Sequence, residues 1–131
     1  MLPIITGFEN DTYYVYLTDK KSQKTFIGKC KLHEEDKENK SSFFGYEIAE
    51  LRAYIKYYKY HIKELQLKQK GISIFINKFS NNKNFNSNGY IERKLKKEFY
   101  LYQKEINTLK NYISITEGNI LGKLKVMDKM K

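Results

Sequence analysis

A chain of 131 residues with 40% hydrophobic residues is long enough for one domain with a modest core, which excludes wholesale disorder. It has no apolar run near the roughly 18 residues that span a bilayer, its first residues lack the basic segment of a signal peptide, and a single cysteine excludes internal disulfide bonds. We therefore expect a cytoplasmic protein whose net charge of +10, nearly all from lysine, reflects either a polyanionic partner or the codon usage of an AT-rich genome.

Residues 1–32 predict a small antiparallel β-meander. Residues 12–18 are β-branched and aromatic, residues 25–32 alternate less regularly, and residues 4–8 supply a first strand, with polar turn residues between them. The face expected to pack on helices carries Tyr13, Val15, Leu17, Phe26, Cys30 and Leu32. The opposite face is expected to expose Tyr14, Tyr16, Lys29 and Lys31.

Residues 33–45 form a charged linker, whose acidic run from Glu34 to Glu38 we interpret as a solubilising loop. Residues 46–113 predict a long antiparallel helical hairpin, because an Asn-rich stretch that continues a helix poorly separates two heptad stripes. The first stripe comprises Ile48, Leu51, Ile55, Tyr58, Ile62, Leu65, Gln69, Ile72, Ile76 and Phe79. The second comprises Leu95, Phe99, Tyr102, Ile106, Leu109 and Ile113.

The sequence allows more than one structure at the far ends of these helices. Gly71 follows two lysines in a pattern typical of a helix end, so residues 72–76 either continue the first helix or form a short strand. The first helix is expected to overhang a shorter second helix. Residues 114–131 predict a turn at Glu117 to Asn119, with or without a fourth strand over 121–126, and a frayed tail over 128–131. The expected fold is α+β, a meander packed with a helical hairpin in a single domain, residues 1–131.

The excess positive charge lies on the hairpin, since residues 56–104 carry a net +9 and residues 33–55 a net −3. Heptad spacing predicts outward rows of cations with tyrosines beside them. On the first helix these are Lys56, Tyr57, Lys59, Tyr60, Lys63 and Lys70, with Lys59 nearer the seam. On the second helix they are Arg93 and Tyr100 on one row and Lys97 and Lys104 on another. Cations interleaved with aromatic rings suit a phosphate backbone and stacked bases, and the alternative is a solvated face without a partner.

Catalytic chemistry has little support in the sequence. Three strands followed by a helix that reads Ala49 to Ala53, Ala-Glu-Leu-Arg-Ala, resemble the opening of a ribonuclease H-like fold, which implies metal-bound carboxylates and nuclease activity. Carboxylates available for such a site are Asp11, Asp19, Glu47 and Glu50. The Asp motif of that family is missing from the strand, and His61 with Glu64 gives only two metal ligands. We therefore expect no enzyme, no cofactor and no metal.

The leading hypothesis is a small interaction protein that binds a host or effector protein, alone or in complex with nucleic acid. A phage or mobile-element inhibitor of a host nucleic-acid machine, such as an anti-CRISPR protein, fits the size and composition. The second hypothesis is direct binding of DNA or RNA through the Lys and Tyr rows. The third is a helical homodimer in place of a monomer, with Gln69 in the intermolecular seam. No membrane contact is expected.

Overall fold

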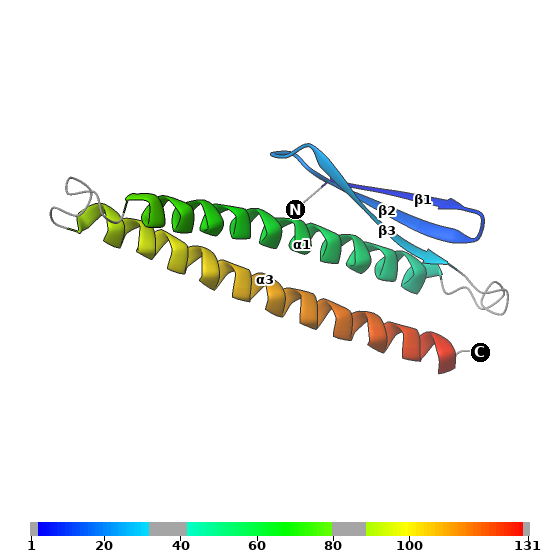
Figure 1. Ribbon diagram of the computed structural model, residues 1–131. Helices are drawn as coiled ribbons and strands as arrows, with labels where there is room; N and C mark the ends of the chain where they lie inside the picture. Colours follow the sequence, from blue (N-terminus) through cyan, green and yellow to red (C-terminus); the bar gives the residue numbers. More distant parts are fainter. Residues whose placement is uncertain (1–2, 32–41, 80–88, 130–131) are drawn as a thin grey trace. The chain divides into compact units, whose positions relative to one another are not determined.

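The structure is a computed structural model that describes residues 3–31, 42–79 and 89–129 (Figure 1). Its elements are three strands, β1 (Ile4–Glu9), β2 (Thr12–Asp19) and β3 (Lys24–Lys31), followed by two helices, α1 (Ser42–Phe79) and α3 (Tyr90–Lys129). The chain divides into two compact units. The first unit comprises residues 1–58 and 112–131, and the second comprises residues 59–111. These elements confirm the expected α+β fold with a three-stranded sheet and a helical hairpin.

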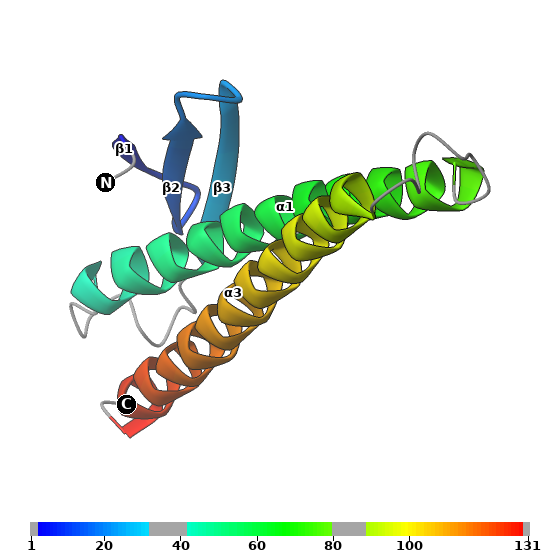
Figure 2. The same ribbon diagram turned by 90° about the vertical axis from the view of Figure 1, so that its left-hand side faces the viewer.

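The sheet has the order β1-β2-β3, with each neighbouring pair antiparallel (Figure 2). Asn10 and Asp11 join β1 to β2 with φ values of 51° and 60°. Two successive positive φ angles are typical of the type I′ turn, whose twist matches that of the strands. The second turn is held by Asp19, whose carboxylate accepts hydrogen bonds from the Ser22 hydroxyl at 2.8 Å and the Lys21 amide at 3.3 Å. Short polar turns therefore join the three strands, at the turn residues that the sequence pattern predicted.

Alternate residues of the sheet are buried against α1 in the first unit. The buried side chains include Tyr13, Val15, Leu17, Phe26 and Cys30 from the sheet and Ile48, Ala49 and Ala53 from α1. The expected inward face of the sheet is thus confirmed, while Leu32 lies outside the described residues. Gly28 lies so near α1 that a Cβ atom there would overlap the backbone of Ala49 and Ala53. Glycine on the strand and alanine on the helix together permit this close approach.

Contacts within each unit join α1 to α3 as antiparallel neighbours, because the residue number in one helix rises as that in the other falls. In the first unit Glu47 binds Lys123 and the Tyr58 ring contacts that of Tyr112. In the second unit the Gln69 amide donates to the Gln103 side chain at 3.0 Å and to the Phe99 carbonyl at 3.3 Å. Gln69 is thus satisfied within one chain, which removes the argument for placing it in an intermolecular seam.

The first helix is continuous through Gly71, so residues 72–76 are helical and the strand alternative is wrong. A glycine in a helix costs about 1 kcal/mol relative to alanine. Ile72, Ile76 and Phe79 continue the predicted stripe beyond Gly71 and are half-buried. Burial of such side chains offsets that cost, because a fully buried one contributes about 1.5–3 kcal/mol.

The second helix is much longer than expected. Residues 114–129 are helical, so the predicted turn near Gly118 and the fourth strand are wrong. Of the tail expected to fray over residues 128–131, Asp128 and Lys129 are helical and the last two residues lie outside the described residues. The buried residues Thr116, Ile120 and Met127 continue the stripe of Ile113 at spacings of three, four and seven. The two helices are 38 and 40 residues long, so the expected overhang is also wrong. At the other end α1 begins at Ser42, inside the predicted linker, whose acidic run lies outside the described residues.

Candidate functional site

The strongest candidate surface is one row of exposed side chains on α3 in the second unit. This row, the α3 band, consists of Tyr90, Arg93, Lys97, Tyr100 and Lys104. Its members follow one another at spacings of three, four, three and four residues, which keeps them on a single helix face. Buried Ile106 and half-buried Phe99 lie on the opposite face, in the hairpin seam. The rings of Tyr90 and Tyr100 are exposed at 59% and 65%, so the hairpin leaves the band open to a partner.

The cations of the band are not neutralised by neighbouring acids. Within the ranges that the structure describes, no carboxylate forms an ion pair with Arg93, Lys97 or Lys104. The adjacent row differs, because Lys96 binds Glu92 at 3.2 Å one helical turn away. An unpaired surface cation attracts an external anion strongly, whereas the opposite charges of an ion pair largely cancel at a distance.

A concavity of about 330 Å³ opens at the start of the band. Its lining residues are Tyr90, Arg93, Lys94 and Lys97. Among the described residues, one phenol ring and three cations line it and no carboxylate does, because Glu92 lies on a different side of the helix and pairs with Lys96. Such a lining suits a ligand that combines a planar ring with a phosphate.

The predicted residues of α1 fall into two groups. Lys63 and Lys70 are exposed in the second unit, as expected for an outward row, and Lys59, expected nearer the seam, is exposed too. Tyr60 is half-buried with its ring 5.9 Å from that of His61. These residues add positive charge to the unit that carries the α3 band. The described part of this unit, residues 59–79 and 89–111, contains eleven Lys and Arg and four Glu, which gives a net charge of +7.

Lys56 and Tyr57 belong instead to the packing of the sheet. The Lys56 ammonium donates to the Ile27 carbonyl of β3 at 2.6 Å, and the Tyr57 ring lies 5.6 Å from Phe26 in an edge-on contact. Arg52 makes the equivalent bond to the Lys29 carbonyl at 2.7 Å. Both cations satisfy backbone carbonyls of an edge strand, which would otherwise lack protein partners. Lys56 is exposed, as expected of an outward position, but its ammonium is held by β3, and Tyr57 is half-buried against the sheet.

A cluster of half-buried tyrosines continues from this contact. Tyr54, Tyr57 and Tyr58 lie with their ring centroids 5.9–6.5 Å apart. Burial raises the pKa of all three phenols above the ordinary value. Weaker contributions come from the carboxylates, Glu50 at Tyr54 and Asp19 at Tyr57, because a nearby negative charge opposes ionisation. These rings are neutral structural groups at physiological pH.

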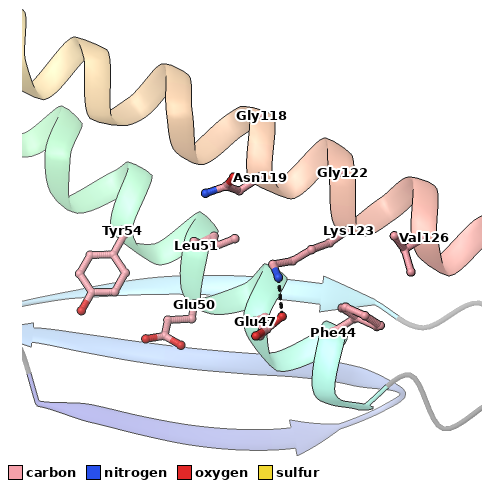
Figure 3. A pocket seen from close by; sticks show the side chains of 10 residues that line it. All are labelled: Phe44, Glu47, Glu50, Leu51, Tyr54, Gly118, Asn119, Gly122, Lys123 and Val126. Carbon is pink, nitrogen blue, oxygen red and sulfur yellow. Dashed lines mark hydrogen bonds and ion pairs between the residues drawn. The ribbon is translucent and has the colours of Figure 1, made fainter.

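A concavity of about 780 Å³ lies in the first unit between the start of α1 and the end of α3 (Figure 3). Figure 3 shows Lys123 of α3 reaching Glu47 of α1, and their charged atoms are 2.6 Å apart. Phe44, 5.6 Å from the Lys123 ammonium, lines the groove beside this pair. A Cβ atom at Gly118 or Gly122 would meet nothing within 4 Å. These two glycines therefore leave the α3 side of the groove without side-chain bulk. The sequence missed the groove because the end of α3 was expected to be a turn and a strand.

Two of the four carboxylates considered for a nuclease make contacts elsewhere. Asp19 holds the turn after β2, and Glu47 binds Lys123. In the chain as described, no three His, Cys, Asp or Glu side chains gather in a way that could hold a metal ion. The structure therefore does not bring Asp11, Asp19, Glu47 and Glu50 together as the metal site that the ribonuclease H resemblance implied.

Sequence reasoning found four of the five members of the α3 band and missed Tyr90. Its spacing of three residues before Arg93 was a usable signal, but it lies beside the Asn-rich stretch where the helix boundary was uncertain. Comparison of the chain with protein-family models, curated proteins and solved structures found no match. None of the helices, as far as they are described, is long and apolar enough to cross a membrane.

Proposed function

We propose that the protein is a non-enzymatic binding protein whose α3 band contacts the backbone of a nucleic acid. The observation that carries the proposal is the band itself, where two exposed rings share one helix face with three cations that form no ion pair with a described carboxylate. Phosphates displace bound counterions when such cations approach, which makes binding favourable and salt-dependent. Exposed rings beside them add contacts to sugars and bases.

The test is equilibrium binding of labelled DNA and RNA over a salt series. The variant Arg93→Glu, Lys97→Glu and Lys104→Glu removes all three cations of the band. Each phosphate contact adds about 0.7 to the salt slope for a single strand and about 0.9 for a duplex, so the slope should fall by about 2 or more. If this variant bound as tightly and as salt-dependently as the wild type, the band would not be the nucleic-acid surface.

The matched control changes the same charge elsewhere. Lys20, Lys21 and Lys125 are exposed in the first unit, and their change to Glu lowers the net charge by the same amount. This control should keep most of the affinity, because close phosphate contacts outweigh distant charges once salt screens them beyond about 10 Å. Equal losses in both variants would show that total charge alone drives binding.

A second candidate is binding to a protein component of a nucleic-acid machine, as expected of an inhibitor. Leu67, Ile74 and Phe75 of α1 are exposed at 62%, 56% and 41% in the second unit. Their spacings of seven and eight residues place them on one side of the helix. Large exposed apolar side chains of this kind mark protein contacts more often than nucleic-acid contacts.

The two candidates respond to different substitutions. Leu67→Glu with Ile74→Glu should abolish binding to a protein partner and leave oligonucleotide affinity unchanged, because neither residue belongs to the α3 band. The charge-reversed band variant should do the opposite. A partner retained by the double Glu variant after nuclease treatment would rule out this apolar surface as its binding site.

A further inference from the structure

We infer that the nucleic acid is single-stranded and that Tyr90 and Tyr100 stack on unpaired bases. This inference rests on the proposed function and adds the class of polymer. A duplex offers a straight helix its phosphates and groove edges, but its base faces are covered by the neighbouring base pairs. Only a single strand exposes the faces on which an aromatic ring can stack.

Tyr100 differs from the tyrosines that pack within the fold, and Tyr90, like Tyr100, exposes more than half of its surface. Tyr54, Tyr57 and Tyr58 pack on one another, and Tyr13 packs on Phe8 and Tyr46 at 4.7 and 4.4 Å. Tyr100 contacts no other aromatic ring and forms no hydrogen bond to any described residue. A ring that is 65% exposed gains little for the fold, so its free face is available to a ligand.

The concavity at Tyr90 has the composition that one nucleotide requires. Its volume of about 330 Å³ is at the small end of the range for ligand pockets, about 300–1,000 Å³. The base would lie against the Tyr90 ring, while Arg93 can bind two oxygens of one phosphate through its planar guanidinium. Lys94 and Lys97 supply further positive charge at its rim.

The order of the band matches the alternation of a single strand. Tyr90 and Tyr100 are ten residues apart, or about 15 Å along the helix axis. Arg93 and Lys97 lie between them, so the phosphates that link the two stacked bases pass over cations. Lys104 extends the same row by one turn for the next phosphate. A strand of a few nucleotides would therefore follow the length of the band.

The probe that separates stacking from charge is an abasic strand, which keeps the phosphates and lacks every ring. We would compare labelled oligothymidylate, an abasic strand of equal length and a blunt duplex at one salt concentration. The wild type should bind oligothymidylate about 10-fold or more tighter than the abasic strand, because each stacked base is worth roughly 5- to 100-fold. Tyr90→Ala with Tyr100→Ala should lower the affinity for oligothymidylate to that for the abasic strand.

Two variants show that the loss comes from the rings and not from misfolding. Tyr90→Phe with Tyr100→Phe keeps both rings and should retain the preference for bases. Tyr112→Ala removes a tyrosine of the same helix that is 47% exposed but outside the band, and it should leave the preference unchanged. Circular dichroism should show equal helix content in all three variants.

The outcomes distinguish this inference from the proposed function. Equal affinity for oligothymidylate and the abasic strand, or tighter binding of the duplex, would overturn the single-strand inference. If the charge-reversed band variant still lost binding in that case, the proposed function would stand. The absence of salt-sensitive binding to any of the three probes would overturn both.

Discussion

Replacing Gly28 by alanine tests whether the sheet of the first unit lies directly on α1. The new methyl group would overlap backbone atoms of Ala49 and Ala53, so no side-chain rotation can relieve the clash and the strand must move away from the helix. Overpacking of this kind costs about 3 kcal/mol at the upper end of its usual range. Alanine also lowers the conformational entropy of the unfolded chain, which offsets about 0.4–1 kcal/mol of this cost. We expect a net loss of about 2 kcal/mol in the free energy of unfolding.

Gly118→Ala is the matched control, because the same methyl group there meets nothing within 4 Å. Gly118 lies inside α3, where alanine is favoured over glycine by about 0.5–1 kcal/mol, so this variant should be more stable than the wild type. Urea unfolding followed by circular dichroism measures both. Gly28→Ala should lower the midpoint by about 1 M and Gly118→Ala should raise it. A Gly28→Ala variant as stable as the wild type would refute the close packing of β3 on α1.

Two further predictions concern the hairpin and the tyrosine cluster. Gln69→Ala should lower the free energy of unfolding by about 1–3 kcal/mol, since it leaves the Gln103 side chain and the half-buried Phe99 carbonyl without this donor, whereas Gln69→Leu fills the space and should cost less. Raised pKa values of Tyr54, Tyr57 and Tyr58 mean that the folded protein holds these protons more tightly than the unfolded chain. Their contribution to stability is therefore complete below about pH 10 and is lost as the pH rises above it. Urea midpoints at neutral and alkaline pH should show a smaller alkaline loss when these three residues are changed to Phe, and an equal loss would contradict the assignment.

The periodic parts of the fold were predictable from the sequence. The first stripe, from Ile48 to Phe79, and the second, from Leu95 to Ile113, are buried or half-buried at every position named. Alternation in β2 likewise identified the face that packs on α1. Both patterns are visible without a structure because an element with one buried face must repeat its apolar residues at its own period.

Local signals were misleading where long-range contacts decide the structure. Gly118 and Gly122 weaken the helix near its end, and the glycine-containing run from Glu117 to Asn119 reads as a turn. The helix nevertheless continues to Lys129, because Thr116, Ile120 and Met127 become buried and Lys123 binds Glu47, 76 residues earlier in the chain. The free energy from those contacts is absent from any local window of sequence.

The candidate surface, too, was predictable from the sequence only in part. By itself, the sequence determined that cations and tyrosines repeat on the outward faces of two helices, since this follows from spacing alone. Only the tertiary structure decided which of them are available to a partner. Lys56 bonds a carbonyl of β3 and Lys97 bonds nothing among the described residues, although both occupy outward positions of a heptad pattern. The difference arises because the sheet lies against α1 at Lys56, and helical periodicity contains no information about what covers an outward face.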